Sequence, residues 1–551
     1  MPRCVALVIG LLILAVLAPP PVGACTNLII TKGASADGST FIAYVADSHE
    51  LYGELYLLAG ASFPPGATRE IIEWDTGKHL GHIPQVATTY TRVGNINEHQ
   101  VSVGETTFGG REELAKPEKK AVVDYGSLMY IALERAKTAR EAIRVMTSLA
   151  EEYGYASEGE TFSVADPNEA WLLEMIGKGE DGMGALWVAW RVPDGTISAH
   201  ANQSRIRRFP LNDPADCMYA KDVISFARAK GWFSGKDEEF SFADTYAPPD
   251  FGSVRACEAR VWSMFRRAAP SASLPIDYVK GVPGATPLPT WIKPDRKLGL
   301  ADAMALLRDH FEGTEFDMTK DVGAGPFSCP YRWRPMEWEV DGAKYVNERA
   351  ISTQQTGFSF IAQMRSTLPD LVGGVLWFGV DDTYSTVWMP MYCGIREVPK
   401  PLAVGVADLN RFSWDSMFWV FNWVANQAYA RYSDIIVDIQ AVQRELEGRF
   451  LADQPEIEKA AVALNDQAPG LARDYLTRYS VAQGDTVHKR WKKLGEDLLV
   501  KYMDGNVKDS QGNVTHPEYP KTWYRRIVQD HGDVIRVPAT PTPTPTPAPT
   551  H

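Results

Sequence analysis

The sequence predicts an α+β fold built on antiparallel sheets, and two observations carry this prediction. Strand-like segments joined by short turns occur near the start of the chain and again at residues 161–201, and two helical segments lie between them. Hairpins on both sides of a helix pair favour antiparallel sheets over a doubly wound parallel fold. With 551 residues, 45% of them hydrophobic, the chain is long enough to bury a core without disulfide staples.

Three hairpins are predicted where strand-like segments flank short turns, each containing Asp together with Gly or Pro. They span residues 26–45, 161–176 and 185–201, with turns at 36–39, 166–168 and 193–195. The run Gly-Lys-Gly-Glu-Asp-Gly at 177–182 has the spacing of a dinucleotide fingerprint, but a strand-like segment follows it. A dinucleotide site needs a helix N-terminus there. We therefore predict a hairpin loop.

Helical segments are predicted in the middle of the chain and towards its end. The first covers residues 125–136, and the second opens at the capping box of Thr138 and Glu141 and ends near Gly154. Residues 210–410 mix helices with loops rich in Pro and Trp. The sequence then becomes mostly helical from 414 to about 505, with breaks expected at 453–455 and 469–470.

The two ends of the sequence have compositions unlike the rest. Residues 1–24 contain Arg3, an apolar run at 5–18, three prolines and then Val-Gly-Ala, which predicts a signal peptide cleaved between Ala24 and Cys25. The expected location is therefore outside the cytoplasm: periplasmic, secreted or at the cell surface. Residues 538–551 alternate Pro with Thr, which favours an extended, disordered tail.

Charge and missing motifs exclude several classes of function. The net charge of −13 argues against a nucleic-acid binder, which would need a basic patch. No apolar run after residue 24 is long enough for a transmembrane segment. His79 and His82 are spaced like metal ligands, but Cys and acidic partners at metal spacing are missing from the neighbouring sequence. We therefore expect no metal and no cofactor.

Cys25 is the strongest catalytic candidate, because signal cleavage would make it the N-terminal residue. Its α-amine would then have a pKa of about 7.7–8.0, near the value that suits a general base. One residue would supply both the nucleophilic thiol and the base that activates it. A nearby ammonium would also enrich the thiolate.

Cys25 and the other cysteines could also have roles other than catalysis. The run from Val22 to Cys25 also fits the signal of an exported lipoprotein, whose lipidated sulfur could not be a nucleophile. A structural disulfide is less suited to a residue at a cleaved terminus. Cys4 leaves with the signal, and the remaining four cysteines could form two disulfides by any of three pairings or stay free and buried. These four are Cys217, Cys257, Cys329 and Cys393.

The sixteen residues that begin at Cys25, CTNLIITKGASADGST, closely resemble the start of the dipeptidase A-like cysteine peptidases. These belong to the N-terminal-nucleophile hydrolases, with the penicillin V acylases, bile salt hydrolases and secernins. The resemblance continues through the segments 97–100, 104–107, 191–203 and 259–262 and, more loosely, 374–377. A lipid anchor would have no reason to share this pattern, so the resemblance favours a catalytic Cys25.

The resemblance implies an αββα sandwich, two antiparallel sheets between helix layers, over residues 25–410. A mostly helical region at 411–537 would follow as an extension. Site residues carry over as well. Asp47 matches an acid beside the nucleophile, although Tyr44 stands where an Arg is expected three positions earlier. Asn202 matches an oxyanion-hole asparagine, Thr107 matches a second oxyanion position, and Arg260 matches a downstream active-site Arg.

The function expected from this resemblance is an exported cysteine dipeptidase that hydrolyses short peptides through a thioester on Cys25. The partners would be dipeptides or short peptides, and a homo-oligomer is compatible with the sequence. An amidase of non-peptide N-acyl substrates could use the same machinery. A protein of a different class, a surface-anchored binding lipoprotein lipidated at Cys25, would explain the signal sequence but not the resemblance.

Overall fold

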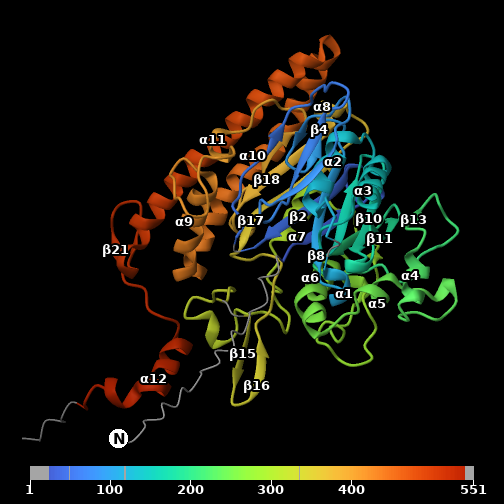
Figure 1. Ribbon diagram of the computed structural model, residues 1–551. Helices are drawn as coiled ribbons and strands as arrows, with labels where there is room; N and C mark the ends of the chain where they lie inside the picture. The colour runs from blue at the N-terminus through green and yellow to red at the C-terminus, as the bar shows by residue number, and fades with distance from the viewer. Residues whose placement is uncertain (1–23, 49, 117–118, 334–335, 540–551) are drawn as a thin grey trace, which may run out of the picture.

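The computed structural model describes residues 24–48, 50–116, 119–333 and 336–539. Two antiparallel sheets lie face to face in its centre, and helices cover both outer faces (Figure 1). This is the αββα arrangement that the resemblance implied, so the predicted fold class is confirmed. Residues 1–23 of the predicted signal peptide (1–24) and residues 540–551 of the predicted tail (538–551) lie outside the described residues.

The first sheet has seven strands in the order β14-β12-β1-β2-β17-β18-β19. Their bounds are Thr26–Ile30 (β1), Thr40–Asp47 (β2), Ile197–His200 (β12), Trp291–Ile292 (β14), Thr356–Met364 (β17), Val375–Val380 (β18) and Met389–Tyr392 (β19). β1 and β2 form the predicted N-terminal hairpin, with Thr26 opposite Val45. Because β1 and β2 are central strands, every side chain on both of them is buried.

The second sheet has eight strands in the order β13-β11-β10-β9-β8-β7-β6-β3. Their bounds are Leu57–Leu58 (β3), Arg92–Val93 (β6), Ile96–Asn97 (β7), Ser102–Phe108 (β8), Gly159–Ala165 (β9), Ala170–Gly177 (β10), Ala185–Arg191 (β11) and Cys217–Tyr219 (β13). β9 and β10 form the second predicted hairpin, and the glycine-rich run 177–182 is the loop between β10 and β11, as predicted.

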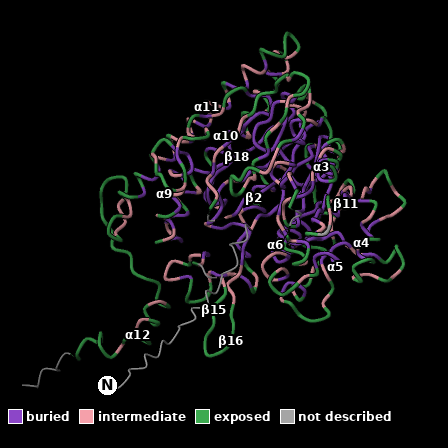
Figure 2. The backbone as a smooth tube through the Cα atoms, in the orientation of Figure 1, coloured by how far each residue is buried: buried purple, intermediate pink, exposed green. Residues whose placement is uncertain are grey.

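Three two-stranded ribbons lie outside these sheets. They are β4 (Thr68–Ile72) with β5 (His79–Pro84), β15 (Glu337–Val340) with β16 (Ala343–Val346), and β20 (Val507–Lys508) with β21 (Val514–Thr515). Figure 2 shows the sheets as the buried centre of the molecule, whereas the β15–β16 ribbon and the last helix are mostly exposed.

Helices form the two outer layers and the C-terminal region. Their bounds are Glu112–Ala115 (α1), Tyr125–Arg135 (α2), Ala139–Tyr153 (α3), Val223–Ala229 (α4), Phe242–Tyr246 (α5), Ala259–Ala268 (α6), Leu300–Leu307 (α7), Asp370–Gly373 (α8), Met417–Ala430 (α9), Tyr432–Gln467 (α10), Pro469–Tyr502 (α11) and Lys521–Ile535 (α12). α2 and α3 pack on the eight-stranded sheet, and α6, α7 and α9 pack on the seven-stranded sheet. The Thr138 hydroxyl caps α3, as its sequence predicts. No described helix is long and apolar enough to span a membrane.

One predicted hairpin is wrong. Residues 185–191 and 197–200 do not pair with each other, because β11 lies between β10 and β13 in one sheet while β12 pairs with β1 and β14 in the other. The turn at 193–195 therefore carries the chain from one sheet to the other. Its residues specify a local reversal, but the partner of each strand is decided by which sheet face buries it.

One predicted helix break is also wrong, and the other is shifted. α10 continues through Pro455, and the expected break at 469–470 is a junction at Ala468 before Pro469 opens α11. A proline inside a helix removes one hydrogen bond. One turn later, Glu458 forms a buried ion pair with Arg365, which connects this part of α10 to the end of β17.

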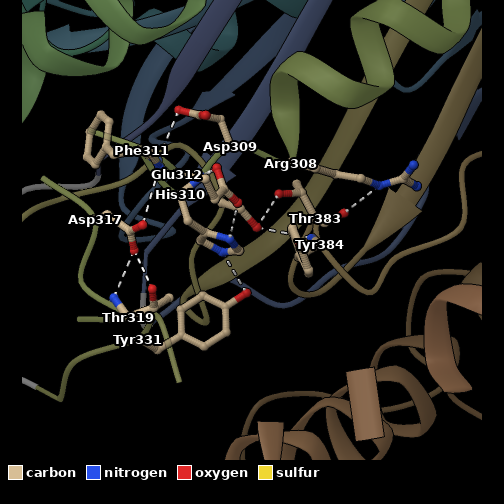
Figure 3. A network of polar contacts seen from close by, with 12 residues as sticks. Arg308, Asp309, His310, Phe311, Glu312, Asp317, Thr319, Tyr331, Thr383 and Tyr384 are labelled. Atoms are coloured by element: carbon tan, nitrogen blue, oxygen red, sulfur yellow. Dashed lines mark hydrogen bonds and ion pairs between the residues drawn. The ribbon is translucent and has the colours of Figure 1, made fainter. Parts of the chain in front are cut away.

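The helical region is fastened to the sheets by buried polar contacts. Arg308 donates to the Thr383 carbonyl at 3.3 Å (Figure 3). It also donates to Glu447 on α10 at 2.7 Å. His310 lies between Tyr331, at 3.0 Å, and Glu312 in the same network.

All five cysteines in the described residues are free thiols. Of the two alternatives that the sequence left open, disulfides or free cysteines, the structure therefore has free cysteines.

Candidate active site

Cys25 immediately precedes β1, a central strand of the seven-stranded sheet, and its side chain is only 7% exposed. Its Sγ lies 3.4 Å from the phenol oxygen of Tyr44, which is on the neighbouring strand β2. Burial raises the pKa of the Cys25 thiol, and the nearby carboxyls of Glu105 and Asp47 raise it further. Hydrogen bonds from Tyr44 and from the Asp47 backbone act in the opposite direction.

Asp47 ends β2 and lies in a tightly bonded group beside the chain before Cys25. Its carboxylate accepts from Arg349 Nη2 at 2.6 Å and from the Thr356 hydroxyl at 2.6 Å. The same Arg349 nitrogen donates to the Ala24 carbonyl, and the Ala24 backbone N–H donates to the Asp47 carbonyl at 2.6 Å. Burial raises the pKa of Asp47, and the Arg349 guanidinium opposes that shift.

Arg260 connects the candidate nucleophile to the candidate oxyanion residue. It is fully buried on α6, where Nη1 donates to the Cys25 carbonyl at 2.6 Å and to Thr26 at 2.8 Å. Its Nη2 donates to the Asn202 side-chain oxygen at 3.0 Å. Because the guanidinium has a fixed planar geometry, these bonds orient the Asn202 amide relative to Cys25.

Asn202 follows β12 and has a left-handed backbone, with φ of 59°. Its amide nitrogen donates to the Thr107 carbonyl at 2.7 Å. The Thr107 hydroxyl points to Glu160, to which it donates at 2.7 Å. Thr107 therefore joins the site through its backbone oxygen, while its side chain is engaged with a carboxyl.

Two buried glutamates complete the surroundings of the thiol. The Tyr44 phenol also hydrogen-bonds Glu105 on β8, and Glu160 lies on the adjacent strand β9. Burial raises the pKa of both carboxyls. Sequence reasoning missed both glutamates, and it missed Arg349, which lies in a loop without a recognisable motif. The available signal for the glutamates was the run of consecutive polar residues within otherwise buried strands, at 105–107 on β8 and 160–161 on β9.

A cavity of about 200 Å³ adjoins these residues, which is smaller than the usual site for a drug-sized ligand. Its wall combines guanidinium groups with apolar side chains and includes both Ala24 and Asn202. The other lining residues include Arg255, Arg260, Arg349, Phe251, Met336 and Val346. Arg255 and Arg349 already pair with Glu348 and Asp47, and Glu337 also lines the cavity, so the lining presents groups of both charges.

A different group of residues has the composition of a metal site. The bulge between Ile71 and Ile72 places Glu70, His79 and His82 on one face of the β4–β5 ribbon, with their ligand atoms within 4.8 Å of one another. The pairing of β4 with β5 thus supplies the acidic neighbour that the local sequence lacks. Imidazole and carboxylate are ligands that Zn²⁺ accepts, but all three residues are exposed.

Comparison with known proteins assigns the chain to a family. The sequence matches Peptidase family C69 over residues 59–445. Curated relatives include a "Probable dipeptidase" of Salmonella dublin, 27% identical over 393 residues (68% of this chain and 82% of the relative). Another "Probable dipeptidase", from Latilactobacillus sakei, is 27% identical over 509 residues (87% and 95%). A "Dipeptidase" of Bifidobacterium longum is 28% identical over 347 residues (54% and 61%). The chain belongs to peptidase family C69 and is a peptidase hydrolase.

Proposed function

We propose that this chain is an exported cysteine dipeptidase in which Cys25, freed by signal cleavage, is the N-terminal nucleophile. The observation that carries the proposal is the Arg260 guanidinium, which bonds the Cys25 carbonyl and the Asn202 side chain at once. A purely structural cysteine would not need its carbonyl fixed to a second polar side chain 177 positions away. The names of the curated relatives support short peptides as substrates.

The proposed reaction begins with proton transfer from the Cys25 thiol to its own α-amine. The thiolate attacks the amide carbonyl, so a carbon–sulfur bond forms and the carbonyl π electrons move onto oxygen. Collapse of this oxyanion breaks the carbon–nitrogen bond, and the α-ammonium gives its proton to the leaving amine. Water then attacks the thioester and gives a proton to the α-amine, and cleavage of the carbon–sulfur bond restores the thiol and releases the acid.

Two groups support the charges that develop in this reaction. Asn202 lines the cavity, and its amide is assigned to the oxyanion, where one such donor is worth about 10²–10³ in rate. The Asp47 carboxylate is assigned to the α-ammonium. In the uncleaved chain Arg349 donates both to Asp47 and to the Ala24 carbonyl. Removal of residues 1–24 takes away that carbonyl and leaves the new ammonium beside this group.

Mass spectrometry of the N-terminus after expression in an exporting host tests the nucleophile. A free, unmodified Cys25 is the expected result, and a diacylglyceryl group on Cys25 would replace the catalytic proposal by the binding-lipoprotein interpretation. A chain that retains one methionine before Cys25 should lose most activity, because its α-amine is displaced. Full activity of that chain would show that the α-amine is not the base.

A substrate panel tests the reaction. Unblocked dipeptides should be hydrolysed to amino acids, and Cys25→Ser should lower kcat/KM by at least about 10³-fold. Cys329→Ser, a partly buried thiol outside the site, is the matched control and should keep wild-type activity. Turnover of N-acyl amides without any release of amino acids from dipeptides would instead establish the amidase alternative.

A further inference from the structure

The phenol of Tyr44 stands between the Cys25 sulfur and a pair of buried carboxyls. It lies 3.4 Å from Sγ and also hydrogen-bonds Glu105. Its ring packs against Phe358 and Phe360 with centroid separations of 5.8 and 5.3 Å. The phenol is therefore held in place and has a single hydrogen to share between a sulfur and a carboxyl.

Glu105 and Glu160 are cross-strand neighbours. In the β8–β9 register Glu105 is opposite Phe162 and Thr107 is opposite Glu160, which makes the two glutamates diagonal neighbours on one face. Their carboxyls are within hydrogen-bonding reach of each other. The Oε2 atoms of both are buried and receive no bond from a donor side chain in the described residues.

The groups that face this pair are acids, phenols and the Cys25 thiol itself, which lies within reach of Glu105. Asp75 and Tyr125, which bond each other at 2.8 Å, influence the pair from the side of α2, and Tyr155 faces Glu160. The two nearby guanidiniums are engaged elsewhere, because Arg349 holds Asp47 and Arg260 holds the Cys25 carbonyl and Asn202. In the described part of the chain, neither Glu105 nor Glu160 forms an ion pair.

A carboxyl pair in this setting keeps a proton. Two carboxylates in contact repel each other, and burial without a cation penalises the charged form of each. One retained proton removes one of the two negative charges, and either carboxyl can carry it. The raised pKa values of Glu105 and Glu160, with burial as the largest cause, agree with this reasoning.

The position of that proton decides where the Tyr44 hydrogen points. If Glu105 is ionised, it accepts the phenol hydrogen, which then faces away from sulfur. If Glu105 carries the proton, it donates to the phenol oxygen, and the phenol hydrogen is directed to the sulfur. Only the second arrangement stabilises a thiolate.

Resting on the proposed function of Cys25, we propose that Tyr44 is a catalytic residue that donates a hydrogen bond to the Cys25 thiolate. Glu105 and Glu160 are positioning residues that together retain one proton. Glu105 carries this proton and donates it to the phenol oxygen, which aims the phenol hydrogen at sulfur. No proton leaves Tyr44 in this scheme, because the thiol proton goes to the α-amine. Tyr44 thus supplies thiolate stabilisation at the position where the resemblance places an Arg.

The test is the pH dependence of Cys25 alkylation by iodoacetamide, read by mass spectrometry of the peptide that begins at Cys25. The chain is processed to start at Cys25, and melting temperatures verify the folding of each variant. Tyr44→Phe should lower the alkylation rate at pH 7 by about 10–100-fold, equal to a rise of about 1–2 units in the thiol pKa. An unchanged alkylation profile in Tyr44→Phe would overturn the proposal.

Two isosteric variants separate the proposal from simple charge removal. The Glu105→Gln amide can donate permanently to the Tyr44 oxygen, so the thiol pKa should fall by about half a unit or more, which is about threefold in rate. Glu160→Gln should instead raise it, because the amide donates to Glu105 and leaves that carboxyl ionised. Simple loss of a negative charge would lower the thiol pKa in both variants. A shift of the same sign in both, or no shift in either, would overturn the proposal.

Asp381→Asn is the matched control, since Asp381 is another buried carboxyl without an ion pair among the described residues, and its carboxyl accepts from Asn422 instead. Its alkylation profile should equal that of the wild-type chain. Because alkylation needs no substrate, the readout is independent of dipeptide hydrolysis. If dipeptides are not cleaved but the opposite shifts appear, the assigned substrate is wrong and the role of Tyr44 stands.

Discussion

Buried carboxyl groups occur in two settings in this molecule, and their charges are neutralised differently. Where α10 packs on the seven-stranded sheet, Arg365 bonds both oxygens of Glu458, at 2.6 and 2.7 Å, and Arg308 bonds Glu447 at 2.7 Å. Behind the Cys25 thiol, Glu105 and Glu160 are at least as deeply buried, but in the described residues they contact each other and hydroxyl groups, with no cation.

This difference separates fixed charges from a titratable pair. A buried ion pair holds its geometry at every physiological pH, and loss of one partner leaves an uncompensated charge. A buried acid without a cation responds by keeping a proton. The carboxyls at the α10 interface therefore serve the fold, whereas the pair near Cys25 can affect the chemistry of the thiol.

The largest expected effect is at the interface. Glu458→Ala should lower the free energy of unfolding by about 3–5 kcal/mol, because it leaves Arg365 buried without its partner. Chemical denaturation measures this change, and kcat of the folded enzyme should be retained. The double variant Arg365→Met/Glu458→Leu should recover most of the loss, and a double variant no more stable than Glu458→Ala would contradict the ion-pair explanation.

A second variant tests a buried acid that belongs to neither setting. Burial raises the pKa of Asp381 from 3.8 to about 8, so the folded state binds an extra proton between these values. The wild-type stability contributed by this proton is complete below about pH 4 and is lost as pH rises towards 8.

Asp381→Asn cannot ionise and should lose this pH dependence, which amounts to a few kcal/mol across the window. Asn also tolerates the φ of 64° at this position. Urea denaturation between pH 4 and pH 8 measures the slope. Parallel stability curves for the two proteins would show that the carboxyl is ionised throughout.

A smaller effect is expected within the titratable pair itself. Glu160→Gln should change the free energy of unfolding by no more than about 1 kcal/mol, because the amide has the shape of the carboxyl, keeps a hydrogen bond to Glu105 and leaves one acidic group where there were two. Glu458→Gln is the matched interface variant, and denaturation of both at pH 7 gives the comparison. An equally large loss in both variants would erase the distinction between the two settings.

The smallest effect should come from Thr107→Val. This change removes the hydroxyl bond to Glu160 but keeps the backbone oxygen that accepts from Asn202. We expect a loss in kcat/KM below about 10-fold, which corresponds to one ordinary hydrogen bond. Asn202→Asp is the reference in the same assay, with an expected loss of about 10²–10³-fold. Equal losses would assign the Thr107 hydroxyl to the oxyanion.

Local patterns and the resemblance predicted much of the fold and part of the site. The β1–β2 hairpin, the capped helix α3 and the fold class follow from turn and capping residues together with the motif at Cys25. Arg260 and Asn202, which the resemblance named, belong to one bonded group with Cys25, and their catalytic roles stay predictions.

The errors and omissions have a common physical origin in partners that are distant along the chain. Residues 193–195 form a turn in either case, but only sheet assembly decides that β11 and β12 separate. Arg349 meets Asp47 from a loop 302 positions away, and Glu105 meets Glu160 through the register of two strands. Pro455 remains helical because of tertiary packing rather than local preference.

The left-handed backbone of Asn202 limits how this position can change during evolution. With φ of 59°, Gly, Asn and Asp are the residues that adopt the conformation readily, and among these three only Asn carries a side-chain N–H. A saturation library at position 202 should therefore give three classes: one active residue, a few folded but inactive ones, and a majority that fold poorly. With the proposed oxyanion role of Asn202, sequence drift through this position would pass by way of an inactive enzyme.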